Sequence, residues 1–281
     1  MSGAAGSGPR PVTLDRTGPR TSVRELLTST WAARELIVLL AQREFFARYR
    51  RASLGVVWAI LLPLVQAIVL AIVFTKVARL HLPVNAFVFV FSGMAAWAFF
   101  NGSISTASTA IVDGAGLSSK VYFPRLALPI VSVASNAYIA VVNAVILVVA
   151  AYVVGSHPGA RPLLLVPAIA LVVVLTTALA TVLAGLHVYL RDLRYLVQAI
   201  LVLAFYLTPV FYPLTSAPRA LRDVVEVNPL TGCIELYREA TIGSDGHVLA
   251  TVGISLGWTA VLVAAALWVH GRFDRVFADL L

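Results

Sequence analysis

Charged residues are spaced so widely along this chain that six stretches between them are each long enough to cross a membrane. The stretches without Asp, Glu, Lys or Arg run over residues 52–75, 80–112, 126–160, 162–190, 195–218 and 246–271. A helix needs about 20 residues to cross the roughly 30 Å of hydrocarbon in a bilayer. The stretches are apolar on all sides rather than alternating, which argues against the strands of a membrane barrel. We therefore predict an all-α integral membrane protein with six transmembrane helices.

The composition excludes a large soluble protein. Of the 281 residues 60% are hydrophobic and only 12% are charged, with a mean hydropathy of +0.91. A soluble domain carries roughly 25% charged residues, which it needs to cover its surface. The single cysteine, Cys233, excludes an internal disulfide. Because the first 30 residues lack the apolar core of a secretory signal, we expect the first span to insert as an uncleaved helix.

The distribution of Lys and Arg predicts the orientation. With six spans and a cytoplasmic N-terminus, the cytoplasmic segments hold fifteen of the 21 Lys and Arg residues, and the outer segments hold Lys76, Arg79, Arg161, Arg219, Arg222 and Arg238. Cytoplasmic loops are the ones enriched in these residues, so we predict that both termini are cytoplasmic. The formal net charge of +8 is then mostly a matter of topology, and no nucleic-acid partner is expected.

The segment before the first span has a different character from the rest. Residues 1–20 are rich in Gly, Pro and Arg and are expected to form a disordered cytoplasmic tail. Over 21–51, by contrast, Val38, Phe45 and Tyr49 share a helical face, and Glu44 and Arg48 form an i,i+4 pair. We predict an amphipathic interfacial helix here, which either anchors on anionic lipid or docks a cytoplasmic partner. The six-span domain would follow over 52–275, with a short cytoplasmic tail over 276–281.

Two features inside the six-span domain leave alternatives open. Residues 213–247, between the last two spans, contain Asn228–Pro229 and the helical stretch LTGCIELYREA with Glu235 and Glu239. Two short re-entrant-type helices on the outer side would fit, and so would an ordinary outer loop. Asn136 and Asn143 lie seven residues apart on one face of the third span, where they either form interhelical hydrogen bonds or line a pathway.

Motifs for chemistry within this chain are missing. The sequence has no phosphate-binding G-x-x-x-x-G-K-[ST] loop, no His/Cys cluster for a metal, and no carboxylate in the middle of a predicted span. Ion-coupled transporters keep ionisable groups near the middle of the membrane. We therefore expect no catalytic residue, metal or cofactor in this chain, and its cargo moves either passively or with energy from another subunit.

Five segments, in this order, resemble the permease subunits of ABC-2-type polysaccharide exporters, which serve O-antigen, capsule, teichoic-acid and galactan export. The similarity covers about residues 30–275, and its segments are REFFARYRRASLGVVWAILLPLVQAIVLAIVF, FSGMAAWAFFNGSI, LSSKVYFPRLALPIVSVASN, YLRDLRYLVQAILVLAFYLTPVFYP and NPLTGCIELYREA. The resemblance implies a homodimer in the plasma (inner) membrane that pairs with two copies of a separate ATPase subunit, which binds ATP and Mg. It also implies a substrate glycan linked to a polyprenyl pyrophosphate lipid.

The resemblance also suggests where the working residues lie. A coupling surface toward the ATPase is expected from the interfacial helix and the loop between the second and third spans, at Arg43, Glu44, Arg48, Arg50, Arg51, Ser119, Lys120, Tyr122, Phe123 and Arg125. The loop residues would equally suit a plain membrane-surface turn. Aromatic rings stack on sugar faces, and the candidates for a glycan path are Trp58, Phe74, Phe87, Phe91, Trp97, Phe100, Phe205, Tyr206, Phe211 and Tyr212.

The aromatic and basic residues also fit more general roles in a membrane protein. Each of the aromatic residues could instead belong to an interfacial belt, and Arg79 and Arg219 could meet either the lipid pyrophosphate or ordinary headgroups. For the chain as a whole, the alternatives are a drug or lipid ABC-2 permease, a membrane-embedded transferase and a passive channel.

Overall fold

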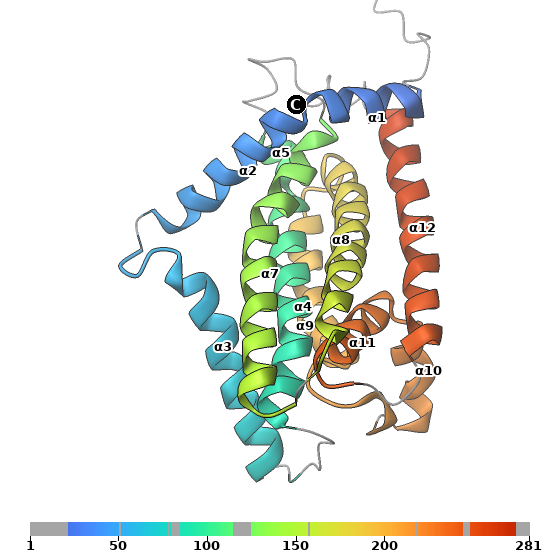
Figure 1. Ribbon diagram of the computed structural model, residues 1–281. Helices are drawn as coiled ribbons and strands as arrows, with labels where there is room; N and C mark the ends of the chain where they lie inside the picture. Colours follow the sequence, from blue (N-terminus) through green and yellow to red (C-terminus); the bar gives the residue numbers. More distant parts are fainter. Residues whose placement is uncertain are drawn as a thin grey trace, which may run out of the picture.

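The computed structural model is a helical bundle, and it describes residues 22–50, 52–77, 79, 85–114, 125–156, 158–216, 218–243 and 248–273. All regular structure in these ranges is helical (Figure 1). Five helical segments are long and apolar enough to cross a membrane, namely Val57–Val77, Ala86–Ala107, Ala127–Val153, Arg161–His187 and Val248–Arg272. They occupy five of the six predicted stretches, so long apolar helices are confirmed for these five.

Each of the five segments contains one long α-helix, and two of them also have a short π or 3₁₀ extension. The first is α3 (Val57–Ile72) continued by a π-helix, η1 (Val73–Val77). The second and third are α4 (Ala86–Ala107) and α7 (Ala127–Val153). A 3₁₀ turn, η2 (Arg161–Leu164), leads into α8 (Leu165–His187), and α12 (Val248–Phe273) is the last.

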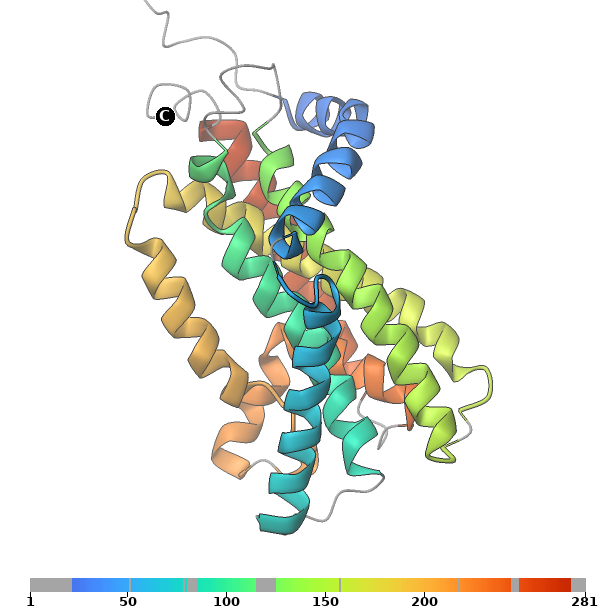
Figure 2. The ribbon, with the colours of Figure 1, turned by 90° about the vertical axis from the view of Figure 1, so that its left-hand side faces the viewer.

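The remaining stretch, 195–218, is helical over a shorter length than predicted. Helix α9 (Leu193–Leu207) has 15 residues, about 22 Å at 1.5 Å per residue, so a sixth long span is not confirmed. It ends at Thr208, which is extended (ψ 137°) and precedes Pro209, and a residue before proline is driven out of the helical region. Helix α9 packs against α4 and α8 and stands at the edge of the bundle (Figure 2).

Helix α4 is the centre of the bundle. It begins at Asn85, whose side chain accepts hydrogen bonds from the amides of Phe87 and Val88 at 3.0 and 3.5 Å. It contacts α3, α7, α8, α9 and α11, and most of its side chains belong to the main hydrophobic core. The alternating phenylalanines near its start therefore lie on a buried helix and not on a strand.

Two helices precede the bundle where the sequence predicted a single one over 21–51. Helix α1 (Val23–Ala32) starts with a capping box between Ser22 and Glu25, and a turn at Ala33 separates it from α2 (Arg34–Tyr49). Helix α1 lies across one end of the bundle beside the last turns of α12 (Figure 1); we call this the α1 end.

Helix α2 leans away from the bundle as it descends, and it packs against α7 (Figure 1). Its buried residues are Ile37, Ala41 and Phe45, which lie four residues apart along one face. Phe45 contacts the ring of Tyr49, as their spacing predicted, whereas Val38, seven residues before Phe45, is 51% exposed. The shared side of the helix is thus packed at Phe45 and Tyr49 but not at Val38.

Near the opposite end of the bundle lie α10 (Arg219–Val227) and α11 (Pro229–Thr241), after a 3₁₀ turn η3 (Leu214–Ser216). Asn228 caps α11 by accepting from the amide of Leu230 at 3.0 Å, and Pro229 occupies the first helical position, which needs no amide donor. Helix α11 packs against α4, α8 and α12 and is largely buried. The predicted helix over LTGCIELYREA is therefore present. We call the end of the bundle where α10 and α11 lie the α11 end.

Candidate functional site

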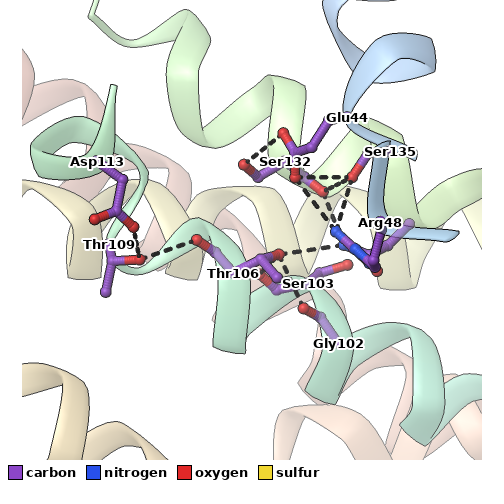
Figure 3. A network of polar contacts seen from close by, with 10 residues as sticks. Glu44, Arg48, Gly102, Ser103, Thr106, Thr109, Asp113, Ser132 and Ser135 are labelled. Carbon is purple, nitrogen blue, oxygen red and sulfur yellow. Dashed lines mark hydrogen bonds and ion pairs between the residues drawn. The ribbon is translucent and has the colours of Figure 1, made fainter. Parts of the chain in front are cut away.

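A group of polar side chains joins α2 to α7 (Figure 3). Arg48 of α2 donates to Asn136 Oδ1 at 2.8 Å and to Ser135 Oγ at 3.4 Å. Glu44, which forms the predicted i,i+4 ion pair with Arg48 at 3.3 Å, accepts from Ser132 and Ser135 at 3.1 and 3.2 Å. The charges of Glu44 and Arg48 thus bond to hydroxyl and amide groups of the long helix α7.

The same group continues into α4. Asn136 Nδ2 donates to Thr106 Oγ1 at 3.3 Å, and the Thr106 hydroxyl donates to the carbonyl of Gly102 at 3.0 Å. One turn further, Thr109 donates to Asp113 Oδ2 at 2.6 Å, and Asp113 closes the short helix α5 (Ala110–Asp113). We call Glu44, Arg48, Thr106, Ser132, Ser135 and Asn136 the polar link (Figure 3). It ties three helices together, and the interhelical alternative for Asn136 is confirmed.

Beside the polar link lies a cavity of about 550 Å³ between α2, α5 and α7. Its polar lining comes from Arg43, Glu44, Ser105, Thr106, Thr109, Asp113 and Ser132. A second cavity of about 530 Å³ lies where α2 turns toward α3, and Arg43, Tyr49 and Arg50 are among its lining residues. Hydroxyls and charges of both signs therefore line the first cavity, whereas the charges that line the second come from Arg43 and Arg50.

The residues expected at the coupling surface are partly placed by the structure. Arg43, Glu44, Arg48 and Arg50 all lie on the second half of α2 or at its end, along the two cavities or in the polar link. Arg125 is half-buried just before α7. The other five expected residues lie outside the described ranges: Arg51, Ser119, Lys120, Tyr122 and Phe123.

Most of the aromatic residues expected along a path gather in one place. Phe211 is central, because its ring stacks on Phe74 at 4.7 Å between centroids and contacts Phe205 at 5.4 Å. Phe205 in turn contacts Trp97 at 5.4 Å. We call the connected rings the aromatic cluster: Phe74, Trp97, Phe100, Phe205, Tyr206, Phe211 and Tyr212. It joins the π-helix η1, α4, α9 and the segment after α9.

Three of the expected path residues lie outside this cluster. Phe87 and Phe91 stack on each other at 5.5 Å on the first turns of α4. Trp58 lies at the start of α3, about 24 Å along the helix from Phe74 by the rise per residue. The structure thus brings seven of the ten together, and Trp58 does not join them.

Sequence reasoning missed a buried ion pair in α11. Arg238 is 2% exposed and Glu235 is 7% exposed, and Arg238 Nη1 donates to Glu235 Oε1 at 2.8 Å. The sequence drew attention to Glu235 and Glu239 and assigned Arg238 to an outer loop. The signal that would have found the pair is its i,i+3 spacing within a helix rich in small and apolar residues.

No group of three or more His, Cys, Asp or Glu side chains within the described ranges is placed to hold a metal ion. The groups that the structure does bring together are the charged and hydroxyl side chains along α2 and α7 and the aromatic rings around η1.

Comparison with known proteins identifies the family. Residues 35–242 match the model of the ABC-2 type transporter membrane family. An O-antigen export system permease protein RfbA of Myxococcus xanthus is 33% identical over 248 residues, which cover 85% of this chain and 93% of the relative. A permease of the same name from Klebsiella pneumoniae is 26% identical over 79% of this chain and 90% of its own length.

A polysialic acid transport protein KpsM of Escherichia coli is 24% identical over 81% of this chain and 87% of the relative. The family match spans most of the chain, including α2, the polar link, the aromatic cluster and α11. The chain belongs to the ABC-2 type transporter family, as a multi-pass membrane permease of the polysaccharide-export kind.

Proposed function

We propose that this chain is the transmembrane subunit of an exporter that moves a lipid-linked polysaccharide across the plasma membrane. A homodimer of the chain would work with two copies of a separate ATPase subunit, which binds ATP and Mg. The relatives named for O-antigen export and for polysialic acid transport support a glycan cargo. A polyprenyl pyrophosphate carrier would let the membrane permease meet the lipid and the sugar together.

The path of the chain supports six crossings with both termini on the cytoplasmic side. Helix α8 ends near the α1 end, and α12 ends there too, beside α1 (Figure 1). Between them the chain must return to the α11 end, and α9 runs in that direction (Figure 2). We propose that α9, together with the extended segment that follows it, makes the fifth crossing, and that α10 and α11 are re-entrant helices on the outer side.

The polar link is the observation that most strongly supports the proposal. Glu44 and Arg48 of α2 hold α7 and α4 through four side chains, at the end of the bundle proposed to face the cytoplasm. A displacement of α2 by an ATPase closing on ATP would therefore pull directly on two of the central helices. Packed helices move as rigid bodies under such a load, and their rotation would open a route at the dimer interface.

The aromatic cluster supports a sugar cargo. Sugar rings have flat C–H faces and hydroxyl edges, and aromatic rings bind the faces while a phenol bonds to the edges. Phe211 and Tyr212 lie together after α9, and Tyr206 is 63% exposed beside them. We propose that these rings line part of the glycan path toward the outer side.

The proposal predicts that the chain forms a stable complex with the ATPase and that lipid-linked glycan stimulates ATP turnover by this complex. Co-expressed with the ATPase of its own gene neighbourhood and purified into nanodiscs, the chain is expected to elute as two permeases with two ATPases. ATP turnover is expected to rise when lipid-linked glycan is added. Mass photometry gives the stoichiometry, and phosphate release gives the turnover.

Two matched additions separate the alternatives. A rise with a small amphipathic drug or with plain phospholipid, and none with lipid-linked glycan, would favour a drug or lipid permease. A chain that purifies without an ATPase and ignores ATP would overturn the proposal. Such a result would favour the transferase or the channel instead.

A Phe211→Leu variant tests the glycan path. The change keeps an apolar side chain of similar size but removes a ring that contacts four others. Sugar stacking is expected to weaken enough to slow glycan-stimulated turnover by about tenfold, the scale of one or two aromatic contacts. Phe99→Leu, which alters a buried ring of α4 that is not among the path candidates, is the control, and equal turnover in the two variants would remove Phe211 from the path.

A further inference from the structure

The buried Arg238 of α11 bonds to more than its ion-pair partner. Its Nη2 donates to the carbonyl of Pro209 at 2.6 Å and to that of Val210 at 3.1 Å, while Nη1 holds Glu235. The guanidinium carbon lies 3.9 Å from the centre of the Phe89 ring, on α4. One side chain therefore joins α11, α4 and the segment that follows α9.

Helix α4 is shaped to admit the same segment. Gly93 lies four residues after Phe89, so the two share a face of α4. A Cβ atom built on Gly93 would overlap the carbonyl group of Val210. The Val210 carbonyl thus lies against Gly93 on one side and accepts from Arg238 on the other, which leaves it little freedom to move.

The segment that is held has few bonds of its own. Residue Thr208 ends α9, and Pro209 has no amide to donate. The Val210 amide reaches only the carbonyl of Thr208, at 2.7 Å, and the Thr208 hydroxyl accepts from Asn228 at 2.9 Å. The residue after Val210 is Phe211, the centre of the aromatic cluster.

We infer that Arg238 is a positioning residue that fixes residues 208–210 against α4 and thereby sets the place of Phe211 and Tyr212 in the aromatic cluster. Its consequence for export rests on the function proposed above, whereas the positioning itself does not. The cargo whose passage depends on it is the sugar chain, because the rings that it sets are the ones proposed to stack on sugars.

Arginine suits this position and lysine does not. A guanidinium is planar, with donors in its plane and an apolar face above it, so it can bond to Glu235 and to two carbonyls while its face lies on Phe89. An ammonium group has no such face, and its donors diverge. Arg238→Lys is therefore expected to keep the ion pair while losing part of the hold on the carbonyls.

The test compares Arg238→Met, Arg238→Lys, Gly93→Ala and the double variant Glu235→Met/Arg238→Met, each in nanodiscs with the partner ATPase. Hydrogen exchange of the peptide over 208–214 reports the positioning, the melting temperature reports stability, and glycan-stimulated ATP turnover reports export. Arg194→Met, at the exposed first turn of α9, is the matched control.

Exchange over 208–214 is expected to rise about tenfold or more in Arg238→Met and in Gly93→Ala, and less in Arg238→Lys, because the loss of charge-assisted bonds to the carbonyls makes opening of the segment more frequent by about that factor. The double variant buries no unpaired carboxylate, so its melting temperature is expected to recover while exchange stays high. Glycan-stimulated turnover should fall in the variants whose exchange rises, and the control should match the unaltered protein.

Three outcomes would overturn the inference. Unchanged exchange over 208–214 in both Arg238→Met and Gly93→Ala would mean that the segment keeps its conformation without Arg238 and without the close contact at Gly93. A return of exchange to the original rate in the double variant would mean that a buried unpaired charge caused the effect. Raised exchange with full glycan response would refute the role in export and leave the proposed function standing, whereas a missing response in the unaltered complex would refute the proposed function instead.

Discussion

A Gly232→Ala variant is expected to lose most of its folded yield. Gly232 lies where α11 crosses α12, and a Cβ atom there would overlap the backbone carbonyl of Thr251 and the hydroxyl of Ser255. A backbone carbonyl inside a helix cannot turn aside, so the two helices must separate. The Ser255 hydroxyl, which donates to the carbonyl of Pro229 at 2.6 Å, would then lose its partner.

Overpacking of this kind costs about 1–3 kcal/mol, and the lost hydrogen bond adds about 1 kcal/mol. The measurement is the monodisperse fraction in mild detergent, with the melting temperature of what remains. The control is Gly257→Ala on α12, where a Cβ atom would meet nothing within 4 Å. Since alanine favours helix over glycine by about 1 kcal/mol, the control should melt at the same temperature or higher. Equal behaviour of the two variants would contradict the close crossing of α11 and α12.

The spans were predictable because they depend on a property of the sequence that no tertiary contact can change. A helix in hydrocarbon satisfies its own backbone, so a long apolar stretch without charge predicts where one lies. The fifth stretch shows the limit of this reasoning. Residues 195–218 contain no charged residue, but the helix ends at Leu207 because Pro209 follows. A prediction that considers only charged residues takes no account of this proline.

The site was predictable only where its geometry is local. The Glu44–Arg48 pair follows from i,i+4 spacing, and it forms as predicted. Its partners on α7 depend on how α2 rests against the bundle, and no spacing within α2 contains that information. Asn136 drew attention as a polar residue in a span, yet its bond to Arg48 crosses 88 positions of sequence. The burial of Arg238 was missed for the same reason, because α4 and the segment after α9 supply most of what surrounds it.

An Arg48→Met variant is expected to separate ATP hydrolysis from export. Methionine keeps the apolar length of the side chain but removes the bonds to Asn136 and Ser135 and the pair with Glu44. Helix α2 would remain on α7 through Ile37, Ala41 and Phe45, so the complex should still assemble. A movement of α2 would then no longer be transmitted to α7 and α4 through the hydrogen bonds of Arg48.

Each hydrogen bond to a charged group contributes about 1.5–3 kcal/mol, so glycan-stimulated turnover is expected to fall by at least about tenfold while basal turnover persists. Glu44→Gln should lose less, because an amide still accepts from one serine hydroxyl, and the double variant should be no worse than Arg48→Met alone, since both residues act in one group. The control is Arg34→Met, which removes an exposed pair with Glu35 on the same helix. Such surface pairs contribute about 0–1 kcal/mol, so the control should keep its glycan response. If Arg48→Met kept that response as well, movement would have to reach the bundle by another route, and the polar link would serve only to hold α2 in place.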